Sequence, residues 1–314
     1  MSAIAVRARG LTKTFGDVIA LAGVDLDIAA GQVHGLVGPN GAGKTTLLGL
    51  VLGLSRPGAG TLEVLGRRVG STVPDEVAGF VDGPGLYPTL TARQNLAAVA
   101  DLRRGPRRPA ADVDTVLDRV GLLDVAGDPI RGFSLGMRQR LGLAAALLGE
   151  PRLLVVDEPA NGLDPAGKRQ VHDVLTDLAH RGGTVVMSSH RMDDLAALSD
   201  EVTLLSQGRV VFTGPIRKLA AESGELDWRL LTSDPDAARR LAAGTPSLRV
   251  VAGRGSAAAD DRALVVRGPE TALDDLVSGL VTDGIAIREL GPVVPPLEAA
   301  FLALTGAPQH EGPR

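Results

Sequence analysis

Short runs rich in valine and leucine alternate with amphipathic stretches along the first two thirds of the chain, and this alternation predicts an α/β domain. Three runs have the buried character of strands in a parallel sheet; they are QVHGLVG (residues 32–38), RLLVVDEP (152–159) and GTVVMSSH (183–190). The segment KTTLLGLVLGL after the first strand is predicted to be a helix. Between the other two strands we expect a second helix, with Asp164 as its N-cap and Pro165 at its first position. Strand, helix and strand in that order indicate a right-handed parallel crossover.

Residues from about 91 to 148 are predicted to be mostly helical and to form a subdomain inserted into this α/β domain. The segment is interrupted by RRGPRRPA (103–110). We interpret this arginine cluster as a solvated loop, the alternative being a patch that binds a partner. We therefore expect the α/β domain to span residues 1–215, with the helical subdomain inside it.

The pattern changes after residue 215. Short strands, LRVVAG, ALVVRG and IAIREL, alternate with helices such as PETALDDLVSGLV, and AGRGSAAADDRA is predicted to be a loop. This pattern predicts a small α+β accessory domain over residues 216–305 that carries no catalytic cluster. Trp228 is expected to pack within it, the alternative being an exposed ring available for stacking. Residues 306–314 are expected to form a disordered tail.

The composition restricts the possible functions of the 314-residue chain. Hydrophobic residues make up 44% of it and aromatic residues only 2%, so the core must be built from aliphatic side chains. The net charge of -4 provides no overall basic field, and we expect no nucleic-acid partner. The absence of cysteine excludes disulfides and cysteine metal sites and fits a reducing cytosol. No apolar run approaches the roughly 18 residues of a membrane span, and no secretory signal is visible, so any work at a membrane requires a partner.

The segment GPNGAGKTT follows the first predicted strand and precedes the first predicted helix. It matches the phosphate-binding pattern G-x-x-x-x-G-K-[ST], in which glycines let backbone N–H groups surround phosphate oxygens. Lys44 would supply a positive charge, and Thr45 a hydroxyl ligand for Mg²⁺. The alternative is a glycine-rich turn with an incidental lysine, which the flanking strand and helix disfavour. The predicted nucleotide-binding residues of this segment are Gly38, Pro39, Asn40, Gly41, Ala42, Gly43, Lys44, Thr45 and Thr46.

Two adjacent carboxylates, Asp157 and Glu158, end the second buried strand. Asp157 can bind Mg²⁺, and Glu158 can orient or deprotonate a water molecule. Alone, such a pair is usually a turn with a helix cap, but beside a phosphate-binding loop it indicates nucleotide hydrolysis. His190 ends the third strand, at the sheet edge where ligands of open α/β sheets bind. There it could contact the γ-phosphate or hold the attacking water.

The stretch FSLGMRQRL, residues 133–141, begins a predicted helix with Ser134 as its N-cap. A helix start presents free N–H groups and the positive end of the helix dipole, which favour an anion. From this segment alone, a capped surface helix without a ligand is the simpler interpretation.

Taken together, these motifs resemble the ATP-binding subunit of an ATP-binding cassette (ABC) transporter over about Ala5 to Pro215. GPNGAGKTT and LLVVDEP match the two Walker motifs of the family, ANGLDP (160–165) its D-loop and SSH its switch histidine. LTKTFGDVIAL is similar to the adenine-stacking segment, with Phe15 as the stacking ring. The resemblance implies a P-loop NTPase fold, in which a RecA-like parallel core carries an antiparallel β subdomain and the helical subdomain. It also implies ATP and Mg²⁺ as cofactors, and catalysis by Glu158, His190 and Lys44.

By the same resemblance, FSLGMRQRL stands at the position of the family signature and is similar to L-S-G-G-x-x-Q-R. In this family two cassettes pair head to tail, so that each signature faces the ATP held by the other. Ser134 and Gly136 would then contact the γ-phosphate across a homodimer. The resemblance further implies a multi-span membrane permease as partner, at the cytoplasmic face of the cell membrane.

Two segments depart from the family pattern. Leu135 replaces the first glycine of the signature, and Phe133 replaces its usual leucine. In AGFVDGPGLYPTLTARQNL, Asp82 stands where most cassettes carry a glutamine that contacts Mg²⁺ and the permease. The alternative is that Asp82 is a turn residue before Gly83. An acidic residue at this position and an extended C-terminal tail resemble the exporters of the bacitracin and daunorubicin type.

We therefore predict an ATP-hydrolysing subunit of an exporter of drugs, antibiotics or lipid-like compounds, although the cassette motifs are compatible with import as well. The predicted Mg²⁺ ligands are Thr45, Asp157 and Asp82. A soluble ABC ATPase that acts in translation or DNA maintenance is disfavoured, because the chain has one phosphate-binding loop and no heptad run. A nucleotide-gated regulator that does not hydrolyse ATP is opposed by the intact carboxylate pair and by His190.

Overall fold

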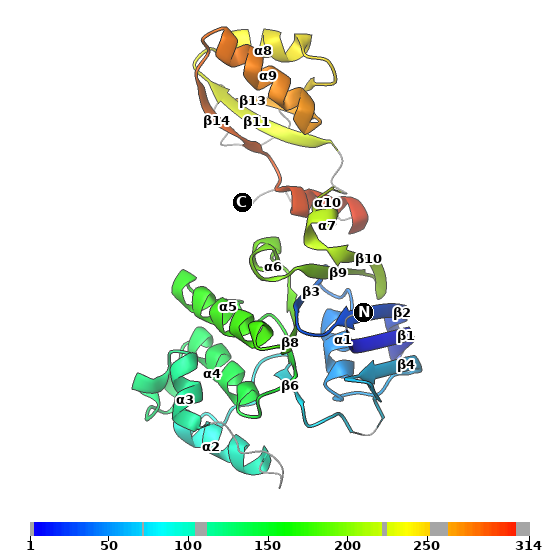
Figure 1. Cartoon of the computed structure of the whole chain (residues 1–314), viewed down its shortest axis with the longest axis vertical. Coiled ribbons are helices and arrows are strands. Elements are labelled where there is room, and N and C mark those ends of the chain that lie inside the picture. The colour runs from blue at the N-terminus through cyan, green and yellow to red at the C-terminus, as the bar shows by residue number, and fades with distance from the viewer. Residues whose placement is uncertain (1–2, 71, 104–111, 222–224, 252–262, 306–314) are drawn as a thin grey trace. The chain divides into compact units, whose positions relative to one another are not determined.

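The computed structural model describes residues 3–70, 72–103, 112–221, 225–251 and 263–305 (Figure 1). Within it the chain divides into two compact units, residues 1–216 and 217–314, which are described separately below. Three predicted segments lie wholly or mostly outside the described residues: the arginine-rich loop, the glycine- and alanine-rich loop of the accessory domain, and the tail at 306–314.

The first unit contains a six-stranded sheet with the strand order β10-β9-β3-β8-β7-β6. All neighbouring strands are parallel except β9 and β10. The strands are β3 (Val33–Val37), β6 (Val77–Phe80), β7 (Leu153–Val156), β8 (Thr184–Ser189), β9 (Glu201–Ser206) and β10 (Arg209–Pro215). The three predicted buried strands are therefore confirmed as β3, β7 and β8, while the short β6 was not predicted. Because these strands are parallel, the carboxyl ends of β3, β6, β7 and β8 meet at one edge of the sheet.

Three helices of the first unit follow strands of this sheet: α1 (Lys44–Val51), α5 (Pro165–His180) and α6 (Met192–Leu198). Helix α7 (Ile216–Ala221) begins at the last residue of this unit and lies mostly in the second. The predicted cap of α5 is confirmed, because the Asp164 side chain accepts a hydrogen bond from the Gly167 N–H at 3.0 Å. Helix α1 ends at Val51, three residues earlier than predicted. Gly53 adopts a left-handed conformation there (φ 70°), and the Leu54 N–H donates back to the Gly49 carbonyl at 2.9 Å, which closes the helix.

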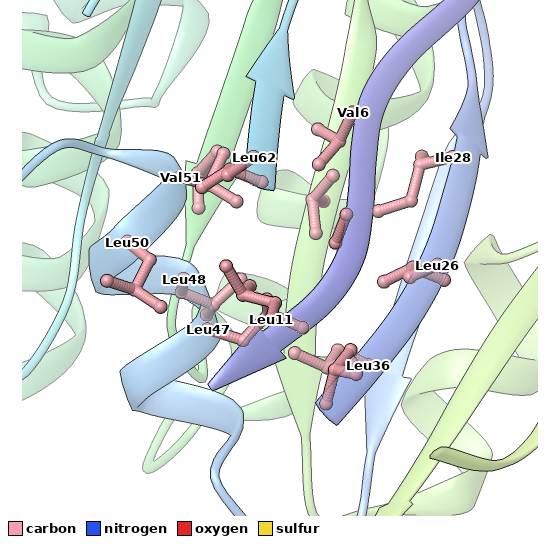
Figure 2. Close-up of a cluster of buried hydrophobic side chains, with 14 of the residues drawn as sticks. Val6, Leu11, Leu26, Ile28, Leu36, Leu47, Leu48, Leu50, Val51 and Leu62 are labelled. Carbon is pink, nitrogen blue, oxygen red and sulfur yellow. The ribbon is translucent and has the colours of Figure 1, made fainter. Parts of the chain in front are cut away.

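A second, antiparallel sheet packs on α1 and completes the core of the first unit. Its order is β2-β1-β4-β5, and its strands are β1 (Ile4–Phe15), β2 (Val18–Ala29), β4 (Ala59–Val64) and β5 (Arg67–Arg68). Figure 2 shows the buried cluster that joins this sheet to the helix and to β3, with Val6, Leu11, Leu26, Ile28, Leu36, Leu47, Leu48, Leu50, Val51 and Leu62 labelled. Every labelled side chain is aliphatic, as the composition requires. This packing anchors the helix that follows the phosphate-binding loop.

The predicted helical subdomain lies in sequence between β6 and β7. It contains α2 (Ala92–Arg103), α3 (Val113–Arg119) and α4 (Leu135–Leu147), with 3₁₀ turns at Leu123–Val125 and Ile130–Gly132. The parallel core, the antiparallel subdomain and this helical insertion confirm the predicted ABC cassette fold.

Besides most of α7, the described residues of the second unit form a four-stranded antiparallel sheet and three further helices. Its strand order is β12-β13-β11-β14, with β11 (Leu226–Thr232), β12 (Arg249–Val251), β13 (Ala263–Gly268) and β14 (Ile287–Pro292). The helices are α8 (Pro235–Gly244), α9 (Glu270–Thr282) and α10 (Pro296–Thr305). Trp228 on β11 packs against the core of this unit, as predicted.

His34, in the middle of β3, is a buried polar residue within the core of the first unit. Its side chain is fully buried, and its Nε2 lies 2.9 Å from Thr203 Oγ1 on β9. Burial lowers the pKa of His34 to about 4, because the charged imidazolium loses its hydration. The folded protein therefore holds this histidine neutral at pH values where the unfolded chain protonates it.

We expect this difference to make the fold acid-sensitive. The pKa of His34 is lower in the folded state, so its stabilising contribution is complete above about pH 6.5 and is lost as the pH falls toward 4. The loss at pH 4 amounts to about 3 kcal/mol of the free energy of unfolding. Thermal unfolding at several pH values tests this, with His34→Gln expected to flatten the pH dependence. His180→Gln changes an exposed histidine on α5 and is the matched control. An unchanged slope in His34→Gln would remove His34 as the cause.

Candidate nucleotide-binding site

Four of the segments singled out in the sequence follow strands whose carboxyl ends share one sheet edge. The loop at residues 38–43 follows β3, the carboxylate pair follows β7, and His190 follows β8. Asp82 comes two residues after β6, and the Asp157 N–H donates to the Phe80 carbonyl at the end of that strand, at 3.1 Å. The parallel sheet therefore brings residues that are far apart in sequence to one place.

The phosphate-binding loop is closed by glycines that no other residue can replace without distortion. Gly43 has a φ of 104°, and a Cβ there would lie 2.5 Å from the Ala20 carbonyl oxygen on β2. A Cβ on Gly38 would lie 2.3 Å from the Leu205 carbonyl oxygen on β9. The loop is thus held between the antiparallel sheet and the parallel sheet. It leads directly into α1, whose first N–H groups have no partner within the helix and favour an anion.

Lys44 is the first residue of α1, and its ammonium group lies against the loop. Its side chain is almost entirely buried, and Nζ donates to the carbonyl oxygens of Gly38 at 2.7 Å and Pro39 at 3.2 Å. Burial lowers the pKa of Lys44, while the negative charges of Glu158 and Asp157 raise it in opposition. The loop therefore contains a desolvated positive charge next to the anion-binding helix start.

Asp157 connects the first turn of α1 to the end of β7. Thr45 Oγ1 donates to Asp157 Oδ2 at 2.8 Å, and Ser188 Oγ donates to the other oxygen, Oδ1. The same Ser188 hydroxyl accepts the Glu158 N–H at 2.9 Å. The sequence analysis did not single out Ser188, although a pair of serines at the end of a buried strand, just before His190, was a visible signal.

Glu158 and His190 are joined directly. His190 Nδ1 lies 2.8 Å from Glu158 Oε2, and the two side chains are 48% and 25% exposed, respectively. Glu158 has a left-handed backbone, with a φ of 50°, which is costly for a residue that is not glycine. Both catalytic candidates therefore lie at the solvent-accessible edge of the sheet, beside the buried Asp157.

The loop after His190 is anchored by a buried carboxylate on α6. Asp194 accepts from Lys168 Nζ of α5 at 3.2 Å, and its carboxylate lies 3.6 Å from the Arg191 guanidinium. Because α5 follows the D-loop, this network connects the D-loop helix with the segment that carries His190.

Asp82 has features both of a turn residue and of a site residue, the two roles considered for it. Its backbone is left-handed (φ 57°) and is followed by Gly83, also at positive φ, as in a turn. Asp82 also lines a pocket of about 550 Å³ together with Asp157, Glu158 and Leu135. Within the described residues, no group of three or more histidine, aspartate or glutamate side chains gathers as a metal site of its own.

The signature segment has the predicted cap but an unexpected contact. Ser134 Oγ accepts the Met137 N–H at 3.2 Å and caps α4, which confirms the predicted helix start. Leu135 packs over Gly162 of the D-loop, where a Cβ would lie 2.7 Å from Leu135 Cδ2. Reciprocally, Leu163 lies over Gly136, 2.5 Å from where a Cβ would stand. The residue that departs from the family pattern therefore contacts the D-loop of its own chain.

Short contacts join Thr45 to Asp157 and Glu158 to His190, and the Ser188 hydroxyl bonds both Asp157 and Glu158. Lys44 bonds the loop carbonyls of Gly38 and Pro39 instead. The residues from Gly38 to Gly43 form the loop between β3 and α1, and Thr46 lies in the first turn of α1. Ser134 and Gly136 lie on the helical subdomain instead. Phe15 lies at the end of β1, where its ring is 53% exposed and Lys13 Nζ is 4.9 Å from the ring centroid.

The chain was compared with known families, proteins and structures. The model of the ABC transporter family matches residues 21–161. A daunorubicin resistance ATP-binding protein of Streptomyces coeruleorubidus is 36% identical over 98% of this chain and 97% of its own length. A bacitracin transport ATP-binding protein of Enterococcus faecalis is 36% identical over 66% of this chain and 68% of its own length. A solved ATP-binding subunit of an ABC transporter is similar with a TM-score of 0.62 and 25% identity, over 69% of this chain and 92% of that one.

The fold, the arrangement of the Walker motifs and the full-length similarity agree. Nucleotide binding by the chain follows from this agreement. The chain belongs to the ATP-binding proteins of the ABC transporter family and is an ATP hydrolase.

Proposed function

We propose that this protein is the ATP-hydrolysing subunit of an exporter of drugs, antibiotics or lipid-like compounds, and that it powers separate membrane subunits. The observation that carries the proposal is the similarity to a daunorubicin resistance ATP-binding protein, which extends through both units of the chain. Among the described helices, none is long and apolar enough to cross a bilayer. We therefore assign the passage of the cargo to a permease partner, with this chain at the cytoplasmic face of the membrane.

In the proposed mechanism, the loop at residues 38–43 and the start of α1 hold the phosphates of ATP through backbone N–H groups. Lys44 turns its buried charge toward the β- and γ-phosphates. The residues present fit Mg²⁺, because Thr45 Oγ1 and Asp157 Oδ2 are hard oxygen donors that lie 2.8 Å apart. When bound, this ion would neutralise phosphate charge. With few protein ligands at hand, the remaining coordination would come from ATP and water.

Glu158 is proposed as the general base. Its Oε2 is engaged by His190, which leaves Oε1 to accept the proton of the attacking water. His190 orients this carboxylate and lies where it can contact the γ-phosphate. Asp157, held from both sides by Thr45 and Ser188, keeps its position while Glu158 takes up the proton.

The site is proposed to be completed by a second copy of the chain. Ser134 is exposed at the start of α4, on an element separate from the phosphate-binding loop of the same chain. In the proposed homodimer, Ser134 and Gly136 of one copy contact the γ-phosphate held by the other. Phe15, exposed at the end of β1, is the proposed stacking surface for the adenine ring. Hydrolysis would then remove the shared γ-phosphate and bias the pair toward opening.

The experiment that tests this function is co-expression with a multi-span membrane protein encoded by a neighbouring gene. We expect the two proteins to purify together in detergent and the ATPase rate of the reconstituted complex to rise on adding the cargo. Daunorubicin and bacitracin are the first probes. Failure of any such membrane protein to bind, with full ATPase activity of the isolated chain, would contradict the transport function while leaving the hydrolase intact.

Asp82 is expected to contribute to turnover rather than to nucleotide affinity. Replacing it with alanine removes a carboxylate from the pocket that Asp157 and Glu158 line. We expect Mg²⁺-dependent ATP turnover of the assembled transporter to fall about tenfold, with nucleotide affinity little changed. Asp82→Asn is the matched control, because asparagine tolerates the left-handed backbone of this turn. A wild-type rate in Asp82→Asn would show that only the turn matters.

A further inference from the structure

We propose that Ser188 is a positioning residue for ATP hydrolysis, which holds Asp157 and Glu158 in their working arrangement through one hydroxyl group. This inference rests on the role proposed above for Glu158. Ser188 touches neither nucleotide nor water in the mechanism and acts through Asp157 and Glu158, the two residues that follow β7.

The position of Ser188 follows from the sheet register. Strands β7 and β8 are parallel, with Val156 opposite Met187, so that Asp157 and Ser188 are the next residues along both strands. Ser188 is fully buried between β7 and β3. The parallel pairing therefore places the Ser188 hydroxyl beside the carboxylate pair, and the surrounding core shields this hydroxyl from solvent.

The Ser188 hydroxyl donates one hydrogen bond and accepts another. It donates to Asp157 Oδ1 and accepts the Glu158 N–H at 2.9 Å. A hydroxyl can do both at once, whereas alanine or valine can do neither. Asp157 Oδ1 is thereby engaged by Ser188, and Oδ2 faces Thr45 at 2.8 Å. A single hydroxyl thus determines which oxygen of Asp157 faces the phosphate-binding loop.

The second bond supports the unusual backbone of Glu158. A left-handed φ of 50° is costly for glutamate, so contacts around it must maintain this conformation. The bond from the Glu158 N–H to Ser188 is such a contact, and it directs the side chain toward His190, 2.8 Å away. Without it, the backbone at Glu158 is free to relax and its carboxylate loses its orientation.

The neighbouring serine has a different set of partners. Ser189 Oγ donates to the Arg191 carbonyl at 3.2 Å and accepts the Arg191 N–H at 3.0 Å. It shapes the loop after His190 and makes no bond to either carboxylate among those described for it. Of the two consecutive serines, Ser188 is therefore the one assigned to the carboxylate pair.

The test compares Ser188→Thr with Ser188→Val in the full-length protein. Threonine and valine have nearly the same shape, so the two variants differ mainly in the hydroxyl group. We expect Ser188→Val to lower kcat about a hundredfold. The KM for ATP and the Kd of a fluorescent ATP analogue are expected to stay within about twofold of wild type, because the loop that binds the phosphates is unchanged. Ser188→Thr should recover most of kcat.

Three controls distinguish a positioning role of Ser188 from a loss of protein stability and from a failure of the role proposed for Glu158. Thr184→Val removes another buried hydroxyl of β8, which accepts the Gly31 N–H at 3.0 Å, and should change the melting temperature without changing kcat. In a Glu158→Gln background, Ser188→Val should lower kcat less than it does in the wild type, because the part of its effect that acts through Glu158 is already lost. If the added methyl group unfolds both Thr and Val variants, Ser188→Ala against wild type gives the same comparison.

Two outcomes would overturn the inference. Equal kcat for Ser188→Val and Ser188→Thr would show that the hydroxyl is not needed. The same reduction of kcat by Ser188→Val in the Glu158→Gln background as in the wild type would show that Ser188 does not act through Glu158. Wild-type turnover by Glu158→Gln alone would instead refute Glu158 as the proposed base. That result would contradict the proposed function of Glu158 and is distinguishable from a failure of the inference about Ser188.

Discussion

Replacing Glu158 with glutamine is expected to lower ATP turnover at least about a thousandfold while nucleotide binding persists. The amide keeps the size of the side chain but cannot accept a proton from water. The phosphate-binding residues Lys44 and Thr45 are unchanged, so ATP should still bind. In the proposed homodimer, unhydrolysed ATP remains between the two copies. The variant should therefore accumulate as an ATP-bound dimer, whereas the wild type returns to monomers after hydrolysis.

Phosphate release and size-exclusion chromatography with and without ATP measure these two effects. Glu150→Gln is the matched control, because Glu150 also has a left-handed backbone, with a φ of 45°, but is exposed and lies just before β7. It should show wild-type turnover and no stabilised dimer. Full turnover by Glu158→Gln would exclude Glu158 as the base, and hydrolysis lost together with ATP binding would point to a structural role.

Replacing Lys44 with methionine is expected to weaken ATP binding at least about a hundredfold, since it removes the buried charge that faces the phosphates. The protein without nucleotide should be at least as stable as the wild type. Burial lowers the pKa of Lys44, which means that holding it charged at neutral pH costs folding free energy. Methionine fills a similar volume without that cost. The buried charge of Lys44 thus lowers the stability of the nucleotide-free protein and raises its affinity for ATP.

Thermal unfolding with and without ATP tests both parts at once. Wild type should gain a clear increase in melting temperature on adding ATP, and Lys44→Met should gain none. Lys218→Met removes an exposed lysine of α7 and serves as the control for the loss of one charge. An undiminished ATP-dependent increase in the Lys44 variant would contradict its assignment to the phosphates. A lower melting temperature without ATP would contradict the buried-charge argument.

The motifs that sequence analysis found are those whose chemistry is contained in consecutive residues. The loop from Gly38 to Gly43, the caps at Ser134 and Asp164, and the buried strands depend on local spacing, and the structure confirms these elements. The end of α1 was misplaced because its closure depends on a local backbone conformation at Gly53 that the apolar pattern does not reveal.

Leu135 and Asp82, which depart from the family pattern, show what cannot be predicted from consecutive residues alone. Leu135 looked like a lost glycine, but in the structure its side chain packs on Gly162, while Leu163 packs on Gly136. Asp82 could be described as a turn residue or as a site residue, and its backbone and its place in the pocket support both descriptions. Such contacts join segments from different subdomains, so no single segment contains them.

By itself, the sequence determined the family, the order of the chemical groups and the helix starts, because each depends on residue type and local spacing. Only the tertiary structure decided how these groups pair. Thr45 meets Asp157, His190 meets Glu158, and Ser188 joins both carboxylates, because β3, β7 and β8 lie side by side in parallel. The physical reason is that parallel strands bring their carboxyl ends to one edge, whatever length of chain connects them.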